Sequence, residues 1–480
     1  MSEVVGLTEV DFVVVGSGPA GQKAAIAAAK AGCKVVVVER EARSGGACVR
    51  HGTIPSKTLR ETALALRSIE RRTAGELRVQ MGDDAEVASL ITRLDEVVGA
   101  HQEYIGRQLE RNAVDLWQGH ARFVGERTIE VTSPRGTKRR LRAKFVILAT
   151  GSRPRSPEGI SLDHDHVLDS DSILSMNQLP RTMAVLGAGV VASEYASIFA
   201  ALGVEVTMID KSSRPMAFLE PELTQAFLSA FSATGSRFLP ERSVVSARYV
   251  RSSSCEVVLT DGAVVRADRV LCAMGRIANV DDLGLECIGV RTTSRGLVAV
   301  DAHGLTNVPY VYAVGDLTGP PALASTAMEQ GRRAVRHALG IASSEAATSA
   351  IPFCAYTIPE IASVGLTEAE VTAKYGGCLV GRAPYSEIAR AHVSAYGDGL
   401  IKLVSGPDGR RVLGVQVVGD GASELVHVGH MAILAKFDVD VFIEATFNFP
   451  TLAEGYRVAA LDVVRQRRDV VAVPEYERSA

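Results

Sequence analysis

The sequence predicts an α/β fold with two βαβ units and a C-terminal α+β domain. The first unit begins with an apolar strand that runs into a glycine-rich turn, an alanine-rich helix and a second apolar strand. The same order of elements returns in the segment that starts at Met183. From Ile351 the pattern changes to strands such as LIKLVSG and VLGVQVVG, followed by helices that begin near Ala422 and Thr451.

The first unit, VVVGSGPAGQKAAIAAAKAGCKVVVVE, is a complete dinucleotide-binding fingerprint. Gly16 permits the tight turn, Gly18 lets a pyrophosphate approach the backbone, and Gly21 allows the helix to pack closely. The helix N-terminus supplies oriented N–H donors for the anion. We expect Glu39, at the end of the second strand, to bind ribose hydroxyls.

The second unit, MAVLGAGVVASEYASIFAALGVEVTMID, follows the same rules at a fixed offset of 171 positions, the difference between 187 and 16. The matched pairs are Gly16 with Gly187, Gly18 with Gly189, Gly21 with Ala192, Gly32 with Gly203, and Glu39 with Asp210. Five matches at one offset indicate a duplication. Two dinucleotide sites in one chain predict a tightly held flavin beside an exchangeable nicotinamide, with hydride passing between the stacked rings.

Composition favours a multidomain enzyme that acts on small molecules. The 480 residues suggest about three domains. Fifty-two basic and 55 acidic residues give a net charge of −3, without a single-sign block that would bind nucleic acid or anionic lipid. The sequence shows no readable export signal and no apolar run long enough to span a membrane.

The cysteines predict neither a metal site nor a disulfide framework. Their number is odd, they are widely scattered, and they lack the close pairs of a zinc site; they are Cys33, Cys48, Cys255, Cys272, Cys287, Cys354 and Cys378. We expect most of them to be buried thiols in a reducing cytoplasm.

Five motifs fall in the order found in the pyridine nucleotide-disulfide oxidoreductases: GGACVRHGTIPSK, ATGSRP, GAGVVASE, VYAVGDLTG and YTIPEIASVGLTE. The resemblance covers nearly the whole chain. Within that superfamily, GTIPSKTLRETAL, LDSDSILSM, YASIF, GASELVHVGH and FNFPTLAEGYRVAAL look most like the soluble, Si-specific NAD(P)⁺ transhydrogenases.

The resemblance implies two Rossmann-like FAD/NAD(P)-binding domains plus a C-terminal α+β dimerisation domain. The implied boundaries are 1–152 for the first part of the FAD domain, 153–279 for the NAD(P) domain, 280–345 for the second part of the FAD domain, and 346–480 for the interface domain. The segment IASSEAATSA after Gly340 is interpreted as a linker. A homodimer is implied, in which FNFPTLAE reaches the partner's flavin.

The resemblance also implies roles near the flavin. The backbone around His120 and Ala121 would meet the adenine, and Asp316 would bind the ribitol chain, although it could be only a turn residue. Lys57 would lie near flavin N5 with Glu194 as its carboxylate partner, where a charged lysine stabilises anionic reduced flavin. The alternative for this pair is a structural ion pair. We expect further cofactor contacts at Cys48, Thr53, Gly151, Gly187, Gly189, Lys211 and Gly275.

Two positions depart from the disulfide reductases. Those enzymes use Cys-x-x-x-x-Cys, whereas this chain has Cys48 followed by Thr53, and a threonine hydroxyl cannot form a disulfide. Phe449 stands where they place a histidine, and it cannot act as acid or base. His51 is interpreted as structural or exposed.

Asp210 favours NAD(H), because a carboxylate at that position accepts hydrogen bonds from the ribose diol and repels a 2′-phosphate. Lys211 and Arg214 could compensate that repulsion, and Ala192 also occurs in NADP-type fingerprints, so use of NADP(H) stays open. Val190 leaves a small side chain at the nicotinamide pocket, which favours nucleotide exchange.

The combined prediction is a cytoplasmic FAD-dependent transhydrogenase that moves hydride between NADPH and NAD⁺ by a ping-pong reaction. The alternative is an NAD(P)H-dependent flavin reductase that acts on a quinone, a dye, oxygen or a specialised small molecule. A catalytically idle FAD-binding partner of a larger complex is a third possibility, disfavoured by the presence of Lys57, Glu194 and Asp210 together.

Overall fold

The computed structural model describes residues 4–73, 86–176, 178–250, 254–342 and 350–467. It divides into two compact units, the first made of residues 1–62, 81–187 and 244–344, and the second of residues 63–80, 188–243 and 345–480. Helix α3 (Thr53–Arg72) begins in the first unit and continues into the second. The predicted linker after Gly340 lies mostly outside the described residues.

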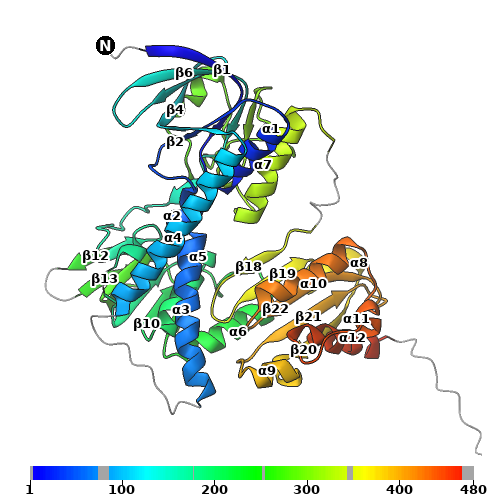
Figure 1. Cartoon of the computed structure of the whole chain (residues 1–480). Coiled ribbons are helices and arrows are strands. Elements are labelled where there is room, and N and C mark those ends of the chain that lie inside the picture. The colour runs from blue at the N-terminus through cyan, green and yellow to red at the C-terminus, as the bar shows by residue number, and fades with distance from the viewer. Residues whose placement is uncertain (1–3, 74–85, 177, 251–253, 343–349, 468–480) are drawn as a thin grey trace, which may run out of the picture. The chain divides into compact units, whose positions relative to one another are not determined.

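The first unit contains a seven-stranded sheet (Figure 1). Its strands are β1 (Val4–Val15), β2 (Val35–Glu39), β3 (Asp115–Gln118), β4 (His120–Gly125), β5 (Thr128–Thr132), β6 (Lys138–Leu148) and β17 (Val311–Ala313). Their order is β3-β2-β1-β6-β5-β4, with β17 also paired to β6. The pairs β1–β2, β2–β3, β1–β6 and β6–β17 are parallel, whereas β5 pairs antiparallel with both β4 and β6.

Alternate residues of β1 face two different cores, as the period of a strand requires. Phe12 and Val14 pack with residues of α1 (Pro19–Lys30) and α7 (Ala324–Ala338), which lie side by side in Figure 1. Val13 and Val15 pack with side chains of β4 and β5 on the other face. Both faces of the parallel strands are therefore covered, which explains why β2 consists of four buried valines before Glu39.

The remaining elements of the first unit are helical segments and the strands of smaller sheets. The helical elements are α2 (Gly46–Arg50), α4 (Glu86–Arg111), η1 (Ile173–Ser175), η2 (Leu285–Ile288) and η3 (Asp316–Thr318). The strands are β7 (Ser152–Pro154), β8 (Val167–Asp169), β9 (Thr182–Leu186), β12 (Val244–Val250), β13 (Ser254–Leu259), β14 (Val264–Ala267), β15 (Arg269–Cys272) and β16 (Arg276–Ala278). Strand β15 pairs in parallel with β8 and β9, β12 to β14 form an antiparallel sheet, and β7 pairs antiparallel with β16.

The second unit contains the helix of the second dinucleotide fingerprint. Its first described elements after α3 are α5 (Val190–Ala201), β10 (Glu205–Ile209), α6 (Pro221–Ser232) and β11 (Arg237–Leu239). Helix α5 packs on β10, and β10 pairs in parallel with β11. Residues 192–200 of α5 are all buried, including the polar Ser193, Glu194 and Ser197.

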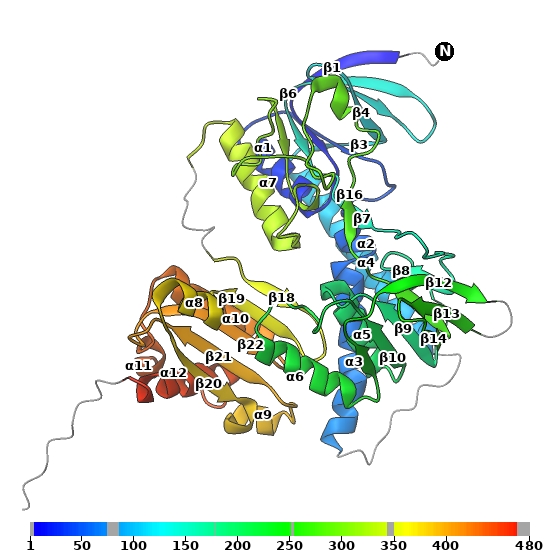
Figure 2. The same ribbon diagram turned by 180° about the vertical axis from the view of Figure 1, so that it is seen from behind.

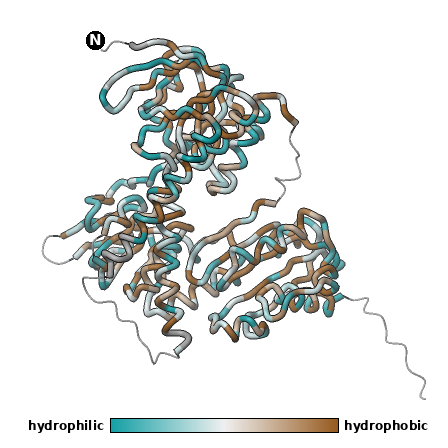
Figure 3. The backbone as a smooth tube through the Cα atoms, in the orientation of Figure 1, coloured by the Kyte–Doolittle hydropathy of each residue, from teal (hydrophilic) through white to brown (hydrophobic). Residues whose placement is uncertain are grey.

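The C-terminal part of the second unit is a five-stranded antiparallel sheet with helices, which confirms the predicted α+β pattern. Its strands are β18 (Phe353–Ala355), β19 (Ile361–Gly365), β20 (Leu379–Pro384), β21 (Leu400–Ser405) and β22 (Val412–Val418), in the order β18-β19-β22-β21-β20. Its helical elements are α8 (Glu368–Tyr375), η5 (Tyr385–Glu387), α9 (Ala389–Val393), α10 (Ala422–Leu434), α11 (Val441–Glu444), η6 (Leu452–Glu454) and α12 (Gly455–Arg465). Helix α10 packs on β19 and β22, and α12 packs on β20 and β21 (Figure 2). Hydrophobic stretches recur along these strands (Figure 3).

Candidate functional site

The first glycine-rich turn needs its glycines for two different reasons. Gly16 has a φ of 101°, and a Cβ there would collide with the carbonyl oxygen of Ala149. A Cβ on Gly21 would collide with the carbonyl oxygen of Gly16. Gly18 differs, because its backbone is ordinary and a Cβ there would come no closer than 4.0 Å to Gly46 Cα. The protein itself therefore leaves space above Gly18, at the N-terminus of α1, which has no side-chain cap.

Glu39 ties the end of β2 to this turn. Its Oε2 accepts hydrogen bonds from the Ser17 backbone N–H at 2.9 Å and from Ser17 Oγ at 2.6 Å. Its Oε1 accepts from the Glu41 N–H at 3.0 Å. The carboxylate is buried, so these donors compensate the loss of water around its charge.

The second turn repeats this arrangement at the same offset. Gly187 has a φ of 109°, and α5 begins after Gly189 without a side-chain cap. Asp210 Oδ2 accepts from the Ala188 N–H at 3.0 Å, and Oδ1 accepts from the Ser212 N–H at 2.7 Å. Residues 188, 210 and 212 each lie 171 positions after 17, 39 and 41, so the duplication extends to individual hydrogen bonds. Ala192 is buried, as expected for the packing position.

In the loop after Asp210, the structure distinguishes the two basic residues that could compensate a 2′-phosphate, Lys211 and Arg214. Arg214 Nη1 donates to Leu219 O at 2.7 Å and Thr224 Oγ1 at 3.1 Å, and its Nη2 donates to Ala217 O at 2.7 Å. The guanidinium thus holds the loop itself, which weakens the expectation that Arg214 compensates a 2′-phosphate. Lys211 is exposed and stays a candidate for that role.

Cys48 and Thr53 lie together, and their side chains are hydrogen-bonded. Burial raises the pKa of the Cys48 thiol above its ordinary value, and Asp316 raises it further, while Thr53 and Lys57 act in the opposite direction. At neutral pH Cys48 is therefore a thiol rather than a reactive thiolate. Because Thr53, Lys57 and Asp316 all act on the pKa of the Cys48 thiol, these four side chains lie near one another.

The seven cysteines are all free thiols, but the expectation that most are buried is wrong. Only Cys255 and Cys272 are buried, Cys287 is exposed, and the other four are partly buried. The scattered spacing of the cysteines indicates that they are unpaired, but it does not determine how exposed each sulfur is.

The predicted partners Lys57 and Glu194 belong to different units. Lys57, on α3, is half-buried and donates to Ser56 Oγ at 3.3 Å. Glu194, on α5, is buried, and its Oε1 accepts from the Tyr356 N–H at 2.8 Å. Their pairing stays a prediction.

A chain of hydrogen bonds brings Asp316 together with two of the predicted glycines. Asp316 Oδ2 accepts from Ser152 Oγ at 2.7 Å, and the same hydroxyl accepts from Arg276 Nε at 2.8 Å. Ser152 follows Gly151, with a φ of 69°, and Arg276 follows Gly275, with a φ of 110°. Sequence reasoning missed Ser152 and Arg276; their signal was adjacency to these two glycines.

The remaining candidates lie on secondary structure. Ala121 is buried on β4, where it pairs with Val131 of β5, and His120 before it is half-buried. His51 ends α2 and is half-buried. Phe449 is 74% exposed in the single chain. Within the described ranges, no cluster of His, Cys, Asp or Glu could hold a metal ion, and no helix is long and apolar enough to cross a membrane.

Comparisons with known proteins agree with this arrangement. The family model described as pyridine nucleotide-disulphide oxidoreductase matches residues 10–331, and the family's dimerisation domain matches residues 351–460. A soluble pyridine nucleotide transhydrogenase of Mycobacterium bovis is 41% identical over 96% of this chain and 98% of that protein. The protein of the same name from Hahella chejuensis is 39% identical over 94% and 97%.

Solved structures give the same fold. The structure of LpdA from Mycobacterium tuberculosis has a TM-score of 0.87 and 27% identity, and it covers 95% of this chain and 99% of LpdA. The HOCl-induced flavoprotein disulfide reductase RclA from Escherichia coli has a TM-score of 0.84 at 23% identity, and it covers 94% and 99%.

Proposed function

The chain belongs to the pyridine nucleotide-disulphide oxidoreductases, and from this membership we propose that it is an FAD-dependent transhydrogenase that moves hydride between NADPH and NAD⁺ through flavin N5. The observation that carries the proposal is the pair of turns that Glu39 and Asp210 hold by matching hydrogen bonds. One turn is available for a bound flavin and the other for an exchangeable nicotinamide. Relatives that match over nearly the full length are named for this activity.

The first turn suits the FAD pyrophosphate. The uncapped N-terminus of α1 and the space above Gly18 are the features that an approaching diphosphate requires. We assign the FAD contacts to Gly16, Gly18, Gly21, Glu39, Cys48, Thr53, Lys57, Ala121, Gly151 and Asp316. Bound flavin supplies a carrier that accepts and returns hydride at one ring atom.

The second turn suits the nicotinamide nucleotides, which would occupy it in succession. We assign their contacts to Gly187, Gly189, Asp210, Lys211 and Gly275. The Asp210 carboxylate favours the ribose diol of NAD(H), and the exposed ammonium of Lys211 is available for the 2′-phosphate of NADP(H). Both nucleotides are therefore accepted, which transhydrogenation requires.

Lys57 and Glu194 are assigned the catalytic roles. The ammonium of Lys57 would stabilise negative charge on bound reduced flavin, with Glu194 as its carboxylate partner. Cys48 and Thr53 carry no electrons in this scheme, because a thiol beside a hydroxyl cannot form a disulfide. Bound flavin and nicotinamide would therefore exchange hydride without a sulfur relay.

We assign residues 1–152 and 280–345 to the FAD domain, 153–279 to the NAD(P) domain and 346–480 to the interface domain. The dimerisation-domain match over residues 351–460 supports a homodimer. The exposed Phe449 supports a partner surface there, because large aromatic side chains are enriched in interfaces. We place the enzyme in the cytoplasm, in keeping with the word soluble in the names of its relatives.

A transhydrogenation assay tests the proposal. Purified holoenzyme is given NADPH and a thio analogue of NAD⁺, and reduction of the analogue is followed by its own absorbance. We expect steady transfer without any quinone, dye or disulfide substrate. If NADH or NADPH reduces the flavin but no second nucleotide is reduced, the chain is a flavin reductase for another acceptor. If neither nucleotide reduces it, the chain is an idle FAD-binding protein.

A further inference from the structure

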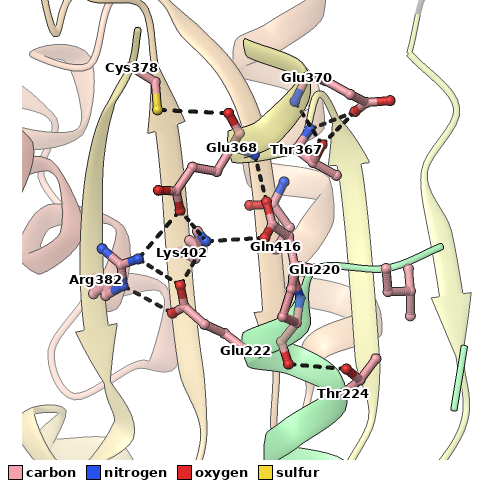
Figure 4. A network of polar contacts seen from close by, with 12 residues as sticks. Glu220, Glu222, Thr224, Thr367, Glu368, Glu370, Cys378, Arg382, Lys402 and Gln416 are labelled. Atoms are coloured by element: carbon pink, nitrogen blue, oxygen red, sulfur yellow. Dashed lines mark hydrogen bonds and ion pairs between the residues drawn. The ribbon is translucent and has the colours of Figure 1, made fainter. Parts of the chain in front are cut away.

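A buried lysine in the second unit binds three carboxylates (Figure 4). Lys402 Nζ lies 2.7 Å from Glu368 Oε2, 2.8 Å from Glu222 Oε1 and 3.3 Å from Glu220 Oε2. Arg382 Nη2 lies 2.6 Å from Glu222 Oε1 and 3.5 Å from Glu368 Oε2. These five residues are called the Lys402 cluster.

The β-strand pattern explains where the ammonium lies. Lys402 is on β21 between Ile401 and Leu403, which face the main core of the C-terminal sheet. Because side chains alternate along a strand, Lys402 points to the opposite face, toward α6 and α8 (Figure 4). Only 1% of its side chain is exposed.

The Lys402 ammonium stays charged in this site. Burial acts to lower its pKa, but hydrogen bonds to Glu222 and Glu368 and the charge of Glu220 outweigh burial, so the pKa is raised. Packing alone does not call for such a group, because a hydrophobic side chain of similar size often gives equal or greater stability than a buried ion pair. The Lys402 cluster instead gives each carboxylate a defined position, because all three are bonded to the same ammonium.

Glu220 is the point that connects the cluster to the nucleotide turn. It ends the loop that starts after Asp210, and its Oε1 accepts from the Glu368 N–H at 2.6 Å while its Oε2 faces Lys402. One residue earlier, the carbonyl of Leu219 is held by Arg214. The far end of the loop is therefore fixed to β21 and α8.

The near part of the same loop holds the backbone of the second turn. The Met216 N–H donates to Ala188 O at 2.9 Å, and the Ala188 N–H donates to Asp210 Oδ2 at 3.0 Å. Both backbone polar groups of Ala188 are thus bonded to the segment that runs from Asp210 to Glu220. A shift of Glu220 would be transmitted to the turn through a loop of ten residues that Arg214 keeps compact.

We propose that Lys402 is a positioning residue for the nicotinamide-nucleotide turn: it fixes Glu220, and through the loop it fixes Ala188 and Asp210. The inference rests on the proposed function, because it takes the second turn to be the nicotinamide site. Lys402 touches no nucleotide. Its loss loosens the turn, weakens nucleotide binding and leaves the first turn and its flavin unchanged.

The test measures NAD⁺ binding to oxidised holoenzyme by calorimetry, with flavin content from absorbance as the check on folding. Lys402→Met removes the charge at similar length, and Glu220→Gln removes the charge at the loop end alone. Glu370→Gln is the matched control, because Glu370 caps α8 by accepting from Thr367 N–H and is not part of the Lys402 cluster. A second readout is flavin reduction by NADH in stopped flow.

We expect Lys402→Met and Glu220→Gln each to raise the dissociation constant for NAD⁺ roughly tenfold, which corresponds to about 1.4 kcal/mol. The limiting rate of flavin reduction at saturating NADH should stay within about twofold of native, because the reacting groups are untouched. Glu370→Gln should bind as the native chain does.

Several outcomes overturn the inference. Folded Lys402→Met or Glu220→Gln with native affinity for NAD⁺ refutes it, and Glu220→Gln decides alone if Lys402→Met does not fold. An equal loss in Glu370→Gln shows a general stability effect and also refutes it. If the native chain binds NAD⁺ but transfers no hydride to a second nucleotide, only the transhydrogenase proposal fails. A native chain that binds neither NAD⁺ nor NADP⁺ overturns both.

Discussion

Ser17 Oγ lies 2.6 Å from Glu39 Oε2, and the same hydroxyl accepts the Gly45 N–H at 3.2 Å. The counterpart of Ser17 in the second turn is Ala188, which has no hydroxyl, so Asp210 receives only the backbone N–H of that residue. The two copies therefore differ in how firmly the turn is held. The firmer first turn suits a cofactor that stays bound, and the second suits nucleotides that exchange.

Ser17→Ala is expected to destabilise the first turn. The change removes one donor to a buried carboxylate and leaves the Gly45 N–H without this acceptor, a loss of about 1–3 kcal/mol. We expect a thermal midpoint lower by a few degrees and faster release of flavin during gel filtration. Ser212→Ala is the control, since Ser212 offers Asp210 a backbone N–H that alanine keeps. Equal behaviour of the two variants would contradict the proposed difference between the turns.

Two glycine substitutions should separate cofactor binding from folding. Gly18→Ala places its Cβ no closer than 4.0 Å to other protein atoms, so the chain should fold, but the added carbon obstructs the pyrophosphate. Gly21→Ala collides with the Gly16 carbonyl and should destabilise the fold itself. The measurements are flavin absorbance and circular dichroism. Gly18→Ala that retains FAD with native affinity would show that the fingerprint is wrongly assigned.

Much of the fold was predictable because its signals are local. The spacing of Gly16, Gly18 and Gly21 fixes a turn and helix start within six residues, and its repeat at Gly187 predicts a second copy. The carboxylates of Glu39 and Asp210 accept hydrogen bonds from the equivalent N–H group of each turn, which confirms the duplication. Such patterns depend on residues whose positions follow directly from one βαβ unit.

What could not be predicted depends on distant parts of the chain. The guanidinium of Arg214 is hydrogen-bonded to Leu219 O in its own loop, a contact that its position near Asp210 in the sequence did not predict. Lys402 stands inside the apolar run LIKLVSG, which was a visible signal of a buried charge. Its partner Glu220 lies 182 positions away, and no local pattern links the two.

Cys48→Ser should leave turnover nearly unchanged, whereas Lys57→Met should slow it. Cys48 is a thiol of raised pKa without a second sulfur at Thr53, so Cys48→Ser should keep most transhydrogenase activity. Lys57→Met removes the charge assigned to reduced flavin, and flavin reduction should slow about tenfold or more for a loss of about 1.4 kcal/mol. Stopped-flow reduction by NADH measures the rate of flavin reduction, and transfer from NADPH to a thio analogue of NAD⁺ measures the transhydrogenase activity. An inactive Cys48→Ser beside a fully active Lys57→Met would require a thiol mechanism.

Asp210→Asn tests nucleotide choice while keeping the turn. An asparagine oxygen can still accept the Ala188 N–H or the Ser212 N–H, but it no longer repels a 2′-phosphate. We expect the ratio of kcat/KM for NADPH to that for NADH to rise, by about tenfold for each 1.4 kcal/mol of repulsion removed. Adding Lys211→Met should reverse the gain. A ratio that does not change in Asp210→Asn would mean that the carboxylate points away from the ribose.

Glu222 should make the second unit sensitive to acid. Its hydrogen bond with Arg382, helped by Lys402 and opposed by burial, lowers its pKa from 4.5 to about 2. The folded chain therefore holds this carboxylate deprotonated more strongly than the unfolded chain does. The resulting stability is fully present above the unfolded pKa near 4.5 and is lost as the pH falls toward about 2.

Native protein should lose stability over that window more steeply than Glu222→Gln, which has no group to protonate there. Thermal midpoints of both proteins from pH 7 to pH 2.5 measure the difference, and Asp11 and Glu130, whose pKa values are also lowered, affect both proteins alike. Parallel curves would show that Arg382 and Lys402 do not stabilise the ionised form of Glu222.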